Sequence, residues 1–354
     1  MGGAPRYEDG TLVEVLAKDG RYLATGFFTA GAPIAVRVVS SERTFEWEAL
    51  VAERLATALR MRLARLELAQ TNTFRWVHGE ADRLPGVHVD VYGDVATVRF
   101  DGAGARAAYG ALPDLLKRAG QLGIREVVDR ELRHGGGELE VRENGVLFGV
   151  DLAHGQKGGL FLDQRENRAE VGRRARGLRV LNLFGYTGGF SLYAALGGAA
   201  RTDTVDVARP AIAAARRNFE RNRLPVDAKS AGFHAVDVFE FLDAARQRGE
   251  RFDLVISDPP AFAKNRAGLP KALAAYRRLH ALAAAVVEPG GLFCAASCSS
   301  QVNRTEFLAN VEAGTKAARR RFLLEAVLGA GFDHPVLPAF PEGEYLKFAV
   351  GHVR

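Results

Sequence analysis

The sequence predicts an α/β protein whose C-terminal half is built around a mostly parallel sheet with helices between the strands. The first observation is an apolar run at 178–184, which is followed by a glycine-rich turn and a helical pattern at 190–196. The second is that later apolar runs, at 204–207 and 252–258, each contain or end at an aspartate. The third is that helical segments separate these runs, as they do in α/β sheets.

The glycine-rich turn predicts a ligand site. Gly185, Gly188 and Gly189 follow the first strand directly, and a backbone without Cβ atoms can approach a ligand closely and adopt positive φ. Asp206 lies about twenty residues farther on, where an acidic residue of a dinucleotide site binds ribose hydroxyls. We therefore expect a nucleotide-like ligand beside this loop.

Three further residues follow predicted strands. Asp237 ends one strand, Asp258 begins the sequence Asp-Pro-Pro after the strand at 252–257, and Cys298 follows the strand at 292–297. Because ligands of such sheets lie outside the carboxyl ends of the strands, Asp258 and Cys298 should face the same site. Cys294 lies inside an apolar strand and is expected in the core.

The glycine loop, Asp206, Asp237 and Asp258-Pro259-Pro260 occur in this order, and together they resemble the class I methyltransferases that use S-adenosylmethionine. The Gly-x-x-Gly-Gly loop differs from the Gly-x-Gly-x-x-Gly of nicotinamide and flavin enzymes, which makes those cofactors less expected. Asp-Pro-Pro-Ala-Phe at 258–262 narrows the resemblance to enzymes that act on nucleic-acid bases. The segment 155–165, Gly-Gln-Lys-x-Gly-x-Phe-Leu-Asp-Gln-Arg, is similar to a signature of 23S (large-subunit) ribosomal RNA 5-methylcytosine methyltransferases.

The chain before this domain is predicted to form two smaller parts. Residues 12–28 and 34–39 alternate apolar and polar side chains, which is typical of short hairpin strands, and a helix should follow at 46–67. This order resembles a PUA-type RNA-binding domain, a small β-barrel, although an unrelated β-domain used for packing is an alternative. The next part should contain hairpin strands broken at Gly86 and Gly93, a helix at 107–119, and strands near 126–128 and 139–150.

The predicted division is therefore a PUA-like domain at 1–69, a central α/β subdomain at 70–168 and a Rossmann-like methyltransferase domain at 169–354. In the last domain we expect helices at 211–222, 271–287 and 304–329. An antiparallel pair at 336–340 and 346–353 should complete a seven-stranded sheet.

The resemblance implies positions for the cofactor. Phe184, Gly185 and Gly188 would line its methionine part, Asp206 would bind the ribose, and Asp237 with Val238 would meet the adenine. Asp163 and Arg165 are further candidates near the methionine end, and Asp258 is a further cofactor-binding candidate. Asp237 could instead cap the helix that follows it, and both roles can hold at once.

The resemblance also implies a covalent mechanism. Carbon 5 of cytosine is too weak a nucleophile to attack a methyl sulfonium, but a thiolate that adds to carbon 6 makes an enamine that can. Cys298 would be that nucleophile and Asp258 would hydrogen-bond the base. Pro259 and Pro260 would shape the base site, and Phe262 would either stack on the base or pack in the core. No residue is identified as the base that removes the carbon 5 proton.

Two other functions stay open at this stage. A guanine or exocyclic-amine RNA methyltransferase would use Asp-Pro-Pro without a cysteine nucleophile, and a non-catalytic RNA-binding protein would not bind the cofactor. Since position 261 is Ala, the chain lacks the second cysteine of many RNA cytosine-5 methyltransferases. Its single candidate cysteine is also the pattern of uracil-5 enzymes, so the cysteine does not decide between cytosine and uracil.

Composition limits the alternatives. The 354 residues are 47% hydrophobic and 25% charged, which is ordinary for a globular protein, and no apolar run has the roughly 18 residues of a membrane span. Two cysteines and no Cys/His cluster of zinc spacing predict neither a disulfide framework nor a metal site. The net charge of +6 favours a polyanionic partner, although a bias towards Arg explains part of it. The resemblance implies that this partner is large-subunit ribosomal RNA, naked or partly assembled. We expect a cytoplasmic protein without a membrane partner; the oligomeric state stays open, with a homodimer among the alternatives.

Overall fold

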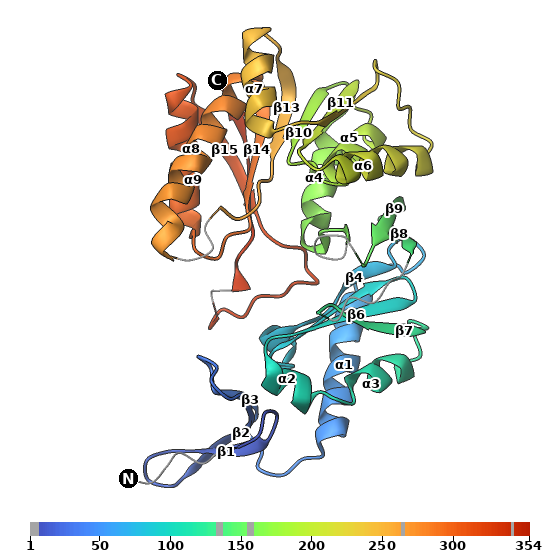
Figure 1. Cartoon of the computed structure of the whole chain (residues 1–354), viewed down its shortest axis with the longest axis vertical. Coiled ribbons are helices and arrows are strands. Elements are labelled where there is room, and N and C mark those ends of the chain that lie inside the picture. The colour runs from blue at the N-terminus through green and yellow to red at the C-terminus, as the bar shows by residue number, and fades with distance from the viewer. Residues whose placement is uncertain (1–6, 132–136, 154–158, 263–265, 341–342) are drawn as a thin grey trace. The chain divides into compact units, whose positions relative to one another are not determined.

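The computed structural model describes residues 7–131, 137–153, 159–262, 266–340 and 343–354 (Figure 1). These residues belong to two compact units. Unit 1 comprises Met1–Gly145, Val150–Gly158 and Phe332–Ala339, and unit 2 comprises Val146–Gly149, Gly159–Gly331 and Phe340–Arg354. The predicted domain boundaries at 69/70 and 168/169 stay a prediction.

Unit 1 begins with the hairpin strands that the alternating pattern predicted. They form an antiparallel sheet of order β1-β2-β3, with β1 at Leu12–Leu16, β2 at Tyr22–Phe28 and β3 at Val36–Ser40. Gly26 is required where β2 passes β3, because a Cβ atom there would lie 2.5 Å from the carbonyl oxygen of Arg37. Helix α1 follows at Trp47–Leu63, within the predicted range.

The central sheet of unit 1 has the order β4-β5-β6-β7. Its elements are β4 (Thr73–His78), the short helix η1 (Gly79–Asp82), β5 (Val87–Tyr92), β6 (Val95–Phe100), α2 (Ala103–Ala108), α3 (Leu112–Arg118) and β7 (Glu126–Asp129). The single helix predicted at 107–119 is wrong, because the structure has two helices here. Pro113 lies in the first turn of α3, where its missing N–H costs nothing, whereas inside one long helix it would break the hydrogen bonding.

One hydrophobic core runs through unit 1. Phe27 from β2, Leu55 from α1 and Trp76 from β4 all belong to it and are almost fully buried. The N-terminal sheet and the central sheet therefore share α1 as a common packing partner. The hairpin of β8 (Glu138–Glu143) and β9 (Val146–Asp151) follows, and of its residues only Val146–Gly149 belong to unit 2.

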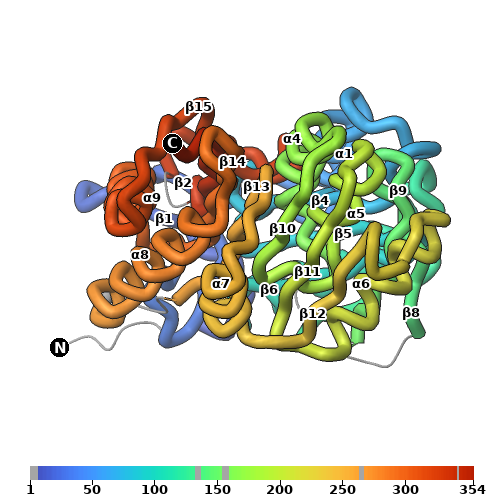
Figure 2. The backbone as a smooth tube through the Cα atoms, turned by 90° about the horizontal axis from the view of Figure 1, so that it is seen from above, coloured from blue at the N-terminus to red at the C-terminus, as the bar shows by residue number. Residues whose placement is uncertain are grey.

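The sheet of unit 2 confirms the predicted seven-stranded architecture. Within the described residues its order is β12-β11-β10-β13-β14-β16-β15, and β16 is antiparallel to both of its neighbours while β10 to β14 are mutually parallel. Figure 2 shows β12, β11, β10, β13 and β14 following one another across the sheet. The strands are β10 (Arg179–Leu183), β11 (Arg201–Asp206), β12 (Ala231–Ala235), β13 (Phe252–Ser257), β14 (Val287–Ser297), β15 (Phe322–Leu328) and β16 (Lys347–Val353).

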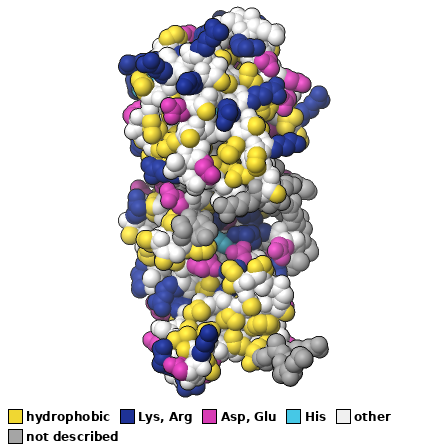
Figure 3. Space-filling model, turned by 90° about the vertical axis from the view of Figure 1, so that its left-hand side faces the viewer, with side chains coloured by type: hydrophobic (Ala, Val, Ile, Leu, Met, Phe, Trp, Pro, Cys, Tyr) yellow, Lys and Arg dark blue, Asp and Glu magenta, His cyan; other side chains and the backbone are white. Residues whose placement is uncertain are grey.

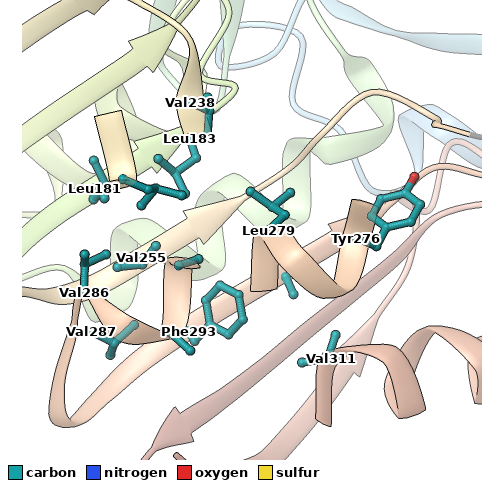
Figure 4. Packing of buried hydrophobic residues seen from close by; sticks show 14 of the residues in the cluster. Leu181, Leu183, Val238, Val255, Tyr276, Leu279, Val286, Val287, Phe293 and Val311 are labelled. Carbon is teal, nitrogen blue, oxygen red and sulfur yellow. The ribbon is translucent and has the colours of Figure 1, made fainter. Parts of the chain in front are cut away.

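Helices cover both faces of this sheet. They are α4 (Arg165–Arg174), preceded by the short helix η3 (Leu162–Gln164), α5 (Gly189–Leu196), α6 (Arg209–Arg221), α7 (Val238–Gln247), α8 (Leu269–Ala285), preceded by η4 (Arg266–Gly268), and α9 (Arg304–Ala317). One core lies under α7, α8 and α9, as Figure 4 shows, and another lies under α4 and α5. Because both faces are covered, the central strands are continuous apolar runs, and Leu254, Val255 and Ile256 are all fully buried.

The helix predicted at 304–329 is wrong in its second half. Helix α9 ends at Ala317, and β15 begins at Phe322 after Arg319 has taken the positive φ of 58°. No glycine or proline marks this turn in the sequence, so the pattern gave no stop signal. The antiparallel pair at the edge is therefore β15 with β16, and the strand predicted at 336–340 is absent from the described residues there.

The distribution of charged side chains on the surface and the hydropathy of the helices are relevant to the predicted polyanionic partner and to a membrane partner. Figure 3 shows Lys and Arg side chains interspersed with Asp and Glu on the visible face, so the positive net charge does not gather in one patch on that face. None of the described helices combines the length and the hydropathy that a membrane crossing requires.

Candidate active site

The loop between β10 and α5 has an unusual backbone. Phe184 has φ 56° and Tyr186 has φ 46°, although neither is a glycine, and Gly188 has φ 80°. A left-handed conformation costs an L-residue roughly 1–2 kcal/mol, and such strain gathers at ligand sites. Gly185 is packed so closely that a Cβ atom there would lie 2.5 Å from Thr204 Cγ2. The predicted glycine corner is thus present, as a tight loop at the carboxyl end of β10.

Asp206 holds this loop at the carboxyl end of β11. Its Oδ2 accepts the backbone N–H of Tyr186 at 2.9 Å, and its Oδ1 accepts that of Ala208 at 2.9 Å. A carboxylate offers about four acceptor positions, so two are used by the backbone and two stay available for hydroxyl donors of a ligand. The side chain is half-buried, as a residue between loop and ligand should be.

Asp237 has the capping role that the sequence left open. Its Oδ1 accepts the backbone N–H groups of Phe239 at 2.8 Å and Glu240 at 3.2 Å, which satisfies the first turn of α7. Val238 is 2% exposed and its side chain belongs to the core. A role of Val238 towards the adenine would therefore fall to its backbone, and the adenine contact of both residues stays a prediction.

Asp258 follows β13 and is held by a residue to which the sequence gave no role. Gln164 donates its Nε2 hydrogen to Asp258 Oδ2 at 2.8 Å, and its Oε1 accepts from Asn167 Nδ2 at 2.6 Å. Asn167 also donates to the carbonyl oxygen of Gly329 at 3.1 Å. This chain of hydrogen bonds fixes the orientation of the Gln164 amide and, through it, one oxygen of Asp258.

The two prolines and Phe262 follow Asp258. Pro259 is buried and Pro260 is exposed, and the Tyr276 hydroxyl donates to the Pro260 carbonyl oxygen at 3.4 Å. Phe262 packs on the Tyr276 ring with 4.6 Å between the ring centres. Phe262 therefore has a packing role and is still partly exposed, so its stacking on a base stays a prediction.

The phenol of Tyr276 is affected by the charges of Asp258, after β13, and of Cys298, after β14. Burial raises the pKa of its phenol above the ordinary value, and the charges of Cys298 and Asp258 act in the same direction. In Figure 4 its hydroxyl points away from the apolar side chains of the core. Asp258 and Cys298 follow the ends of β13 and β14, which are paired in parallel with Ser257 opposite Ala295.

The two cysteines differ as predicted. Cys294 is 1% exposed inside β14, and burial raises the pKa of its thiol to about 12. Cys298 is half-buried and lies just past the end of β14, next to the strand that precedes Asp258. Burial makes Cys294 unsuited to thiolate chemistry, and the role of Cys298 as a nucleophile stays a prediction.

Asp163 and Arg165 lie before and at the start of α4. The hydroxyl of Tyr345 donates to Asp163 Oδ2 at 2.7 Å, and the backbone of Asp163 accepts from Gly331 N at 3.0 Å. Arg165 is almost fully buried and contacts Glu166. The roles of Asp163 and Arg165 towards a cofactor stay predictions, and Gln156 and Lys157 of the predicted signature lie outside the described residues.

Comparisons with known proteins identify the family. A model of S-adenosylmethionine-dependent methyltransferases matches residues 134–328, and a model of PUA-like domains matches residues 2–41. The chain belongs to the S-adenosylmethionine-dependent methyltransferases. Relatives named ribosomal RNA large subunit methyltransferase I are 35% identical in Aeromonas salmonicida, over 98% of this chain and 91% of that protein, and 36% identical in Shewanella amazonensis, over 97% and 91%.

Solved structures show the same fold. A methyltransferase complexed with SAH is 24% identical with a TM-score of 0.85, over 98% of this chain and 92% of that chain. An S-adenosylmethionine-dependent methyltransferase from Streptococcus mutans is 23% identical with a TM-score of 0.83, over 98% and 93%.

S-Adenosylmethionine is therefore the cofactor of this methyltransferase, and the residues at the sheet edge fit it. The strained loop at 184–188 and the two acceptor positions left on Asp206 are the features that a nucleoside with ribose hydroxyls requires. Within the described residues, no group of three or more His, Cys, Asp and Glu side chains is arranged to hold a metal ion.

Proposed function

We propose that this methyltransferase transfers a methyl group from S-adenosylmethionine to carbon 5 of a cytosine in large-subunit ribosomal RNA, through a covalent adduct with Cys298. The relatives named as large-subunit ribosomal RNA methyltransferases support the substrate. The observation that carries the chemistry is the pairing of a half-buried thiol and a hydrogen-bonded carboxyl group at the ends of two neighbouring parallel strands.

Cys298 supplies the nucleophile. Its thiolate adds to carbon 6 of the cytosine, and the electron pair displaced from the double bond makes carbon 5 nucleophilic. The cofactor contributes an electrophilic methyl group on sulfur. Loss of the carbon 5 proton then restores the double bond and expels Cys298, so the enzyme is regenerated.

Asp258 orients the base and stabilises the charge that develops on it. Its Oδ2 accepts from Gln164, which helps to fix the orientation of the carboxyl group. When protonated, the carboxyl group donates to N3 of the cytosine, and when ionised it accepts from the exocyclic amine.

The remaining predicted residues bind the cofactor and the base. Phe184, Gly185 and Gly188 line the methionine part, Asp206 binds the ribose, and Asp237 with the backbone of Val238 meets the adenine, with Asp163 and Arg165 near the methionine end. Pro259, Pro260 and Phe262 form the wall beside the base. A paired base is out of reach inside a helix, so the target cytosine is single-stranded or flipped out.

The PUA-like domain is proposed to contact the RNA outside the catalytic site. Contacts of such a domain with phosphates fix the position of the RNA and carry little sequence information.

The proposal is tested with tritium-methylated cofactor and bulk ribosomal RNA that lacks this modification. Wild type should place the label in 5-methylcytidine after digestion to nucleosides, whereas Cys298→Ala should bind the cofactor and transfer no label. Label in a methylated guanosine or adenosine that survives in Cys298→Ala would contradict the proposal and support an enzyme without a cysteine nucleophile.

A further inference from the structure

A buried lysine contacts the turn that carries the candidate nucleophile. Lys347 begins β16 and is paired in register with Ser297, the last residue of β14. Its side chain is 2% exposed. The ammonium group donates to the carbonyl oxygen of Ser299 at 2.6 Å and to that of Tyr345 at 2.8 Å. Lys347 thus contacts the residues on either side of Cys298, through strand pairing on one side and a hydrogen bond on the other.

This ammonium group lacks the partner that a buried cation normally has. In the described part of the chain no carboxylate lies within 4.0 Å of its Nζ, and the charges of Glu344 and Glu306 act on it only from farther away. Burial lowers the pKa of Lys347 to about 8, while Cys298, Glu344 and Glu306 act in the opposite direction. Burying a cation that is not paired with an anion is unfavourable. A lysine at this position therefore needs a function for its charge that a neutral side chain would not provide.

Among the groups that favour the charged lysine, Cys298 has the largest effect. Electrostatic coupling is reciprocal, so the ammonium group favours the thiolate of Cys298 to the same extent. An ammonium has three N–H donors, and the two carbonyl oxygens use two of them. The thiolate of Cys298, when it forms, is an anion within electrostatic reach of this group.

We propose that Lys347 is the positioning residue of the nucleophile: its ammonium group fixes the turn that carries Cys298 and stabilises the thiolate. The inference rests on the proposed function, since it gives the lysine a purpose in the covalent mechanism. The thiol proton leaves to solvent, because Lys347 already carries its own proton. Other ionisable groups around this turn are Tyr276 and Asp258, which lie on the side of β13 and α8.

The test measures the thiol itself and needs neither RNA nor cofactor. The full-length protein is treated with iodoacetamide from pH 5 to pH 9, and the rate of alkylation of Cys298 is followed by intact mass, with Cys298→Ala as the blank for Cys294. Lys347→Met should move the half-maximal rate to higher pH and slow alkylation at pH 7 by about tenfold or more, since a neighbouring opposite charge changes a pKa by about 1–3 units. Lys347→Arg should restore part of the rate.

Lys316→Met is the matched control, because Lys316 is an exposed lysine in the last turn of α9. Its alkylation profile should coincide with that of wild type. A folded Lys347→Met protein whose profile also coincides with wild type overturns the proposal.

A reciprocal measurement covers the case in which Lys347→Met does not fold. In protein labelled with ¹³C-lysine, the Cε signal of Lys347 should titrate at lower pH in Cys298→Ala than in wild type, and an unchanged titration overturns the proposal. Neither experiment depends on methyl transfer. A shifted alkylation profile together with an active Cys298→Ala enzyme would therefore refute the proposed function alone.

Discussion

Gln164 offers a sharp test of the site, because its side chain donates a hydrogen bond to Asp258. It is 3% exposed, donates to Asp258 Oδ2 at 2.8 Å and accepts from Asn167 at 2.6 Å. Gln164→Leu keeps most of the volume and removes the donor. A hydrogen bond to a charged group contributes about 1.5–3 kcal/mol. If that contribution is made in the transition state, kcat/KM should fall roughly 10- to 150-fold.

The assay is methyl incorporation into ribosomal RNA under single-turnover conditions, together with cofactor affinity and thermal stability of each variant. Gln247→Leu is the control, since Gln247 is exposed near the end of α7. We expect cofactor affinity close to wild type in both variants and a loss of rate only in Gln164→Leu. A Gln164→Leu enzyme within twofold of wild type would refute the role of this hydrogen bond in orienting Asp258.

Two further predictions concern the cofactor loop and the core. A Cβ atom at Gly188, where φ is 80°, would lie 2.8 Å from Ala215 Cβ, so Gly188→Ala should weaken cofactor binding, measured by calorimetry, about tenfold or more. Gly249 also has a positive φ, 69°, but open space around it, so Gly249→Ala should leave cofactor binding unchanged. Equal effects of the two substitutions would contradict the steric reasoning. Burial lowers the pKa of His280 to about 3, so the unfolded chain, with a pKa near 6.5, binds the proton first and stability falls as the pH decreases from 6.5 towards 3. At pH 5 this effect of His280 lowers the free energy of unfolding by about 2 kcal/mol. His280→Leu should therefore lose about that much less unfolding free energy than wild type between pH 7 and pH 5. Denaturant titrations that give equal losses for the two proteins would contradict this prediction.

The site residues that the sequence predicted are those placed by strand ends. Asp206 ends β11, and Asp258 and Cys298 follow β13 and β14. Parallel strands bring their carboxyl ends to one edge whatever the details of the loops. Cys294 was predicted in the core for the same reason, since it lies inside the strand, four residues before Cys298. Recognising where each strand ends in the sequence is sufficient to predict that these residues lie at one edge of the sheet.

The sequence could not predict contacts that depend on how loops pack. Gln164 meets Asp258 across 94 residues and Tyr345 meets Asp163 across 182, and no local pattern links them. Lys347 was missed because a lysine at the start of a strand is ordinarily exposed. The quoted signature contained Gln164, so the resemblance could have drawn attention to it, but only the structure shows what it holds.

The central claim is that Cys298 attacks the cytosine, and a covalent trap tests it most directly. The target RNA is prepared with 5-fluorocytidine in place of cytidine, so that after methyl transfer carbon 5 carries fluorine and has no proton to lose. Cys298 then cannot be expelled, and wild type incubated with cofactor should form an RNA–protein complex that survives denaturing electrophoresis, with the linked peptide containing residue 298. No such complex should form with Cys298→Ala, while the Cys294→Ala protein should form it as wild type does. A wild-type enzyme that methylates ordinary RNA but forms no complex, or forms one at another residue, would contradict the account.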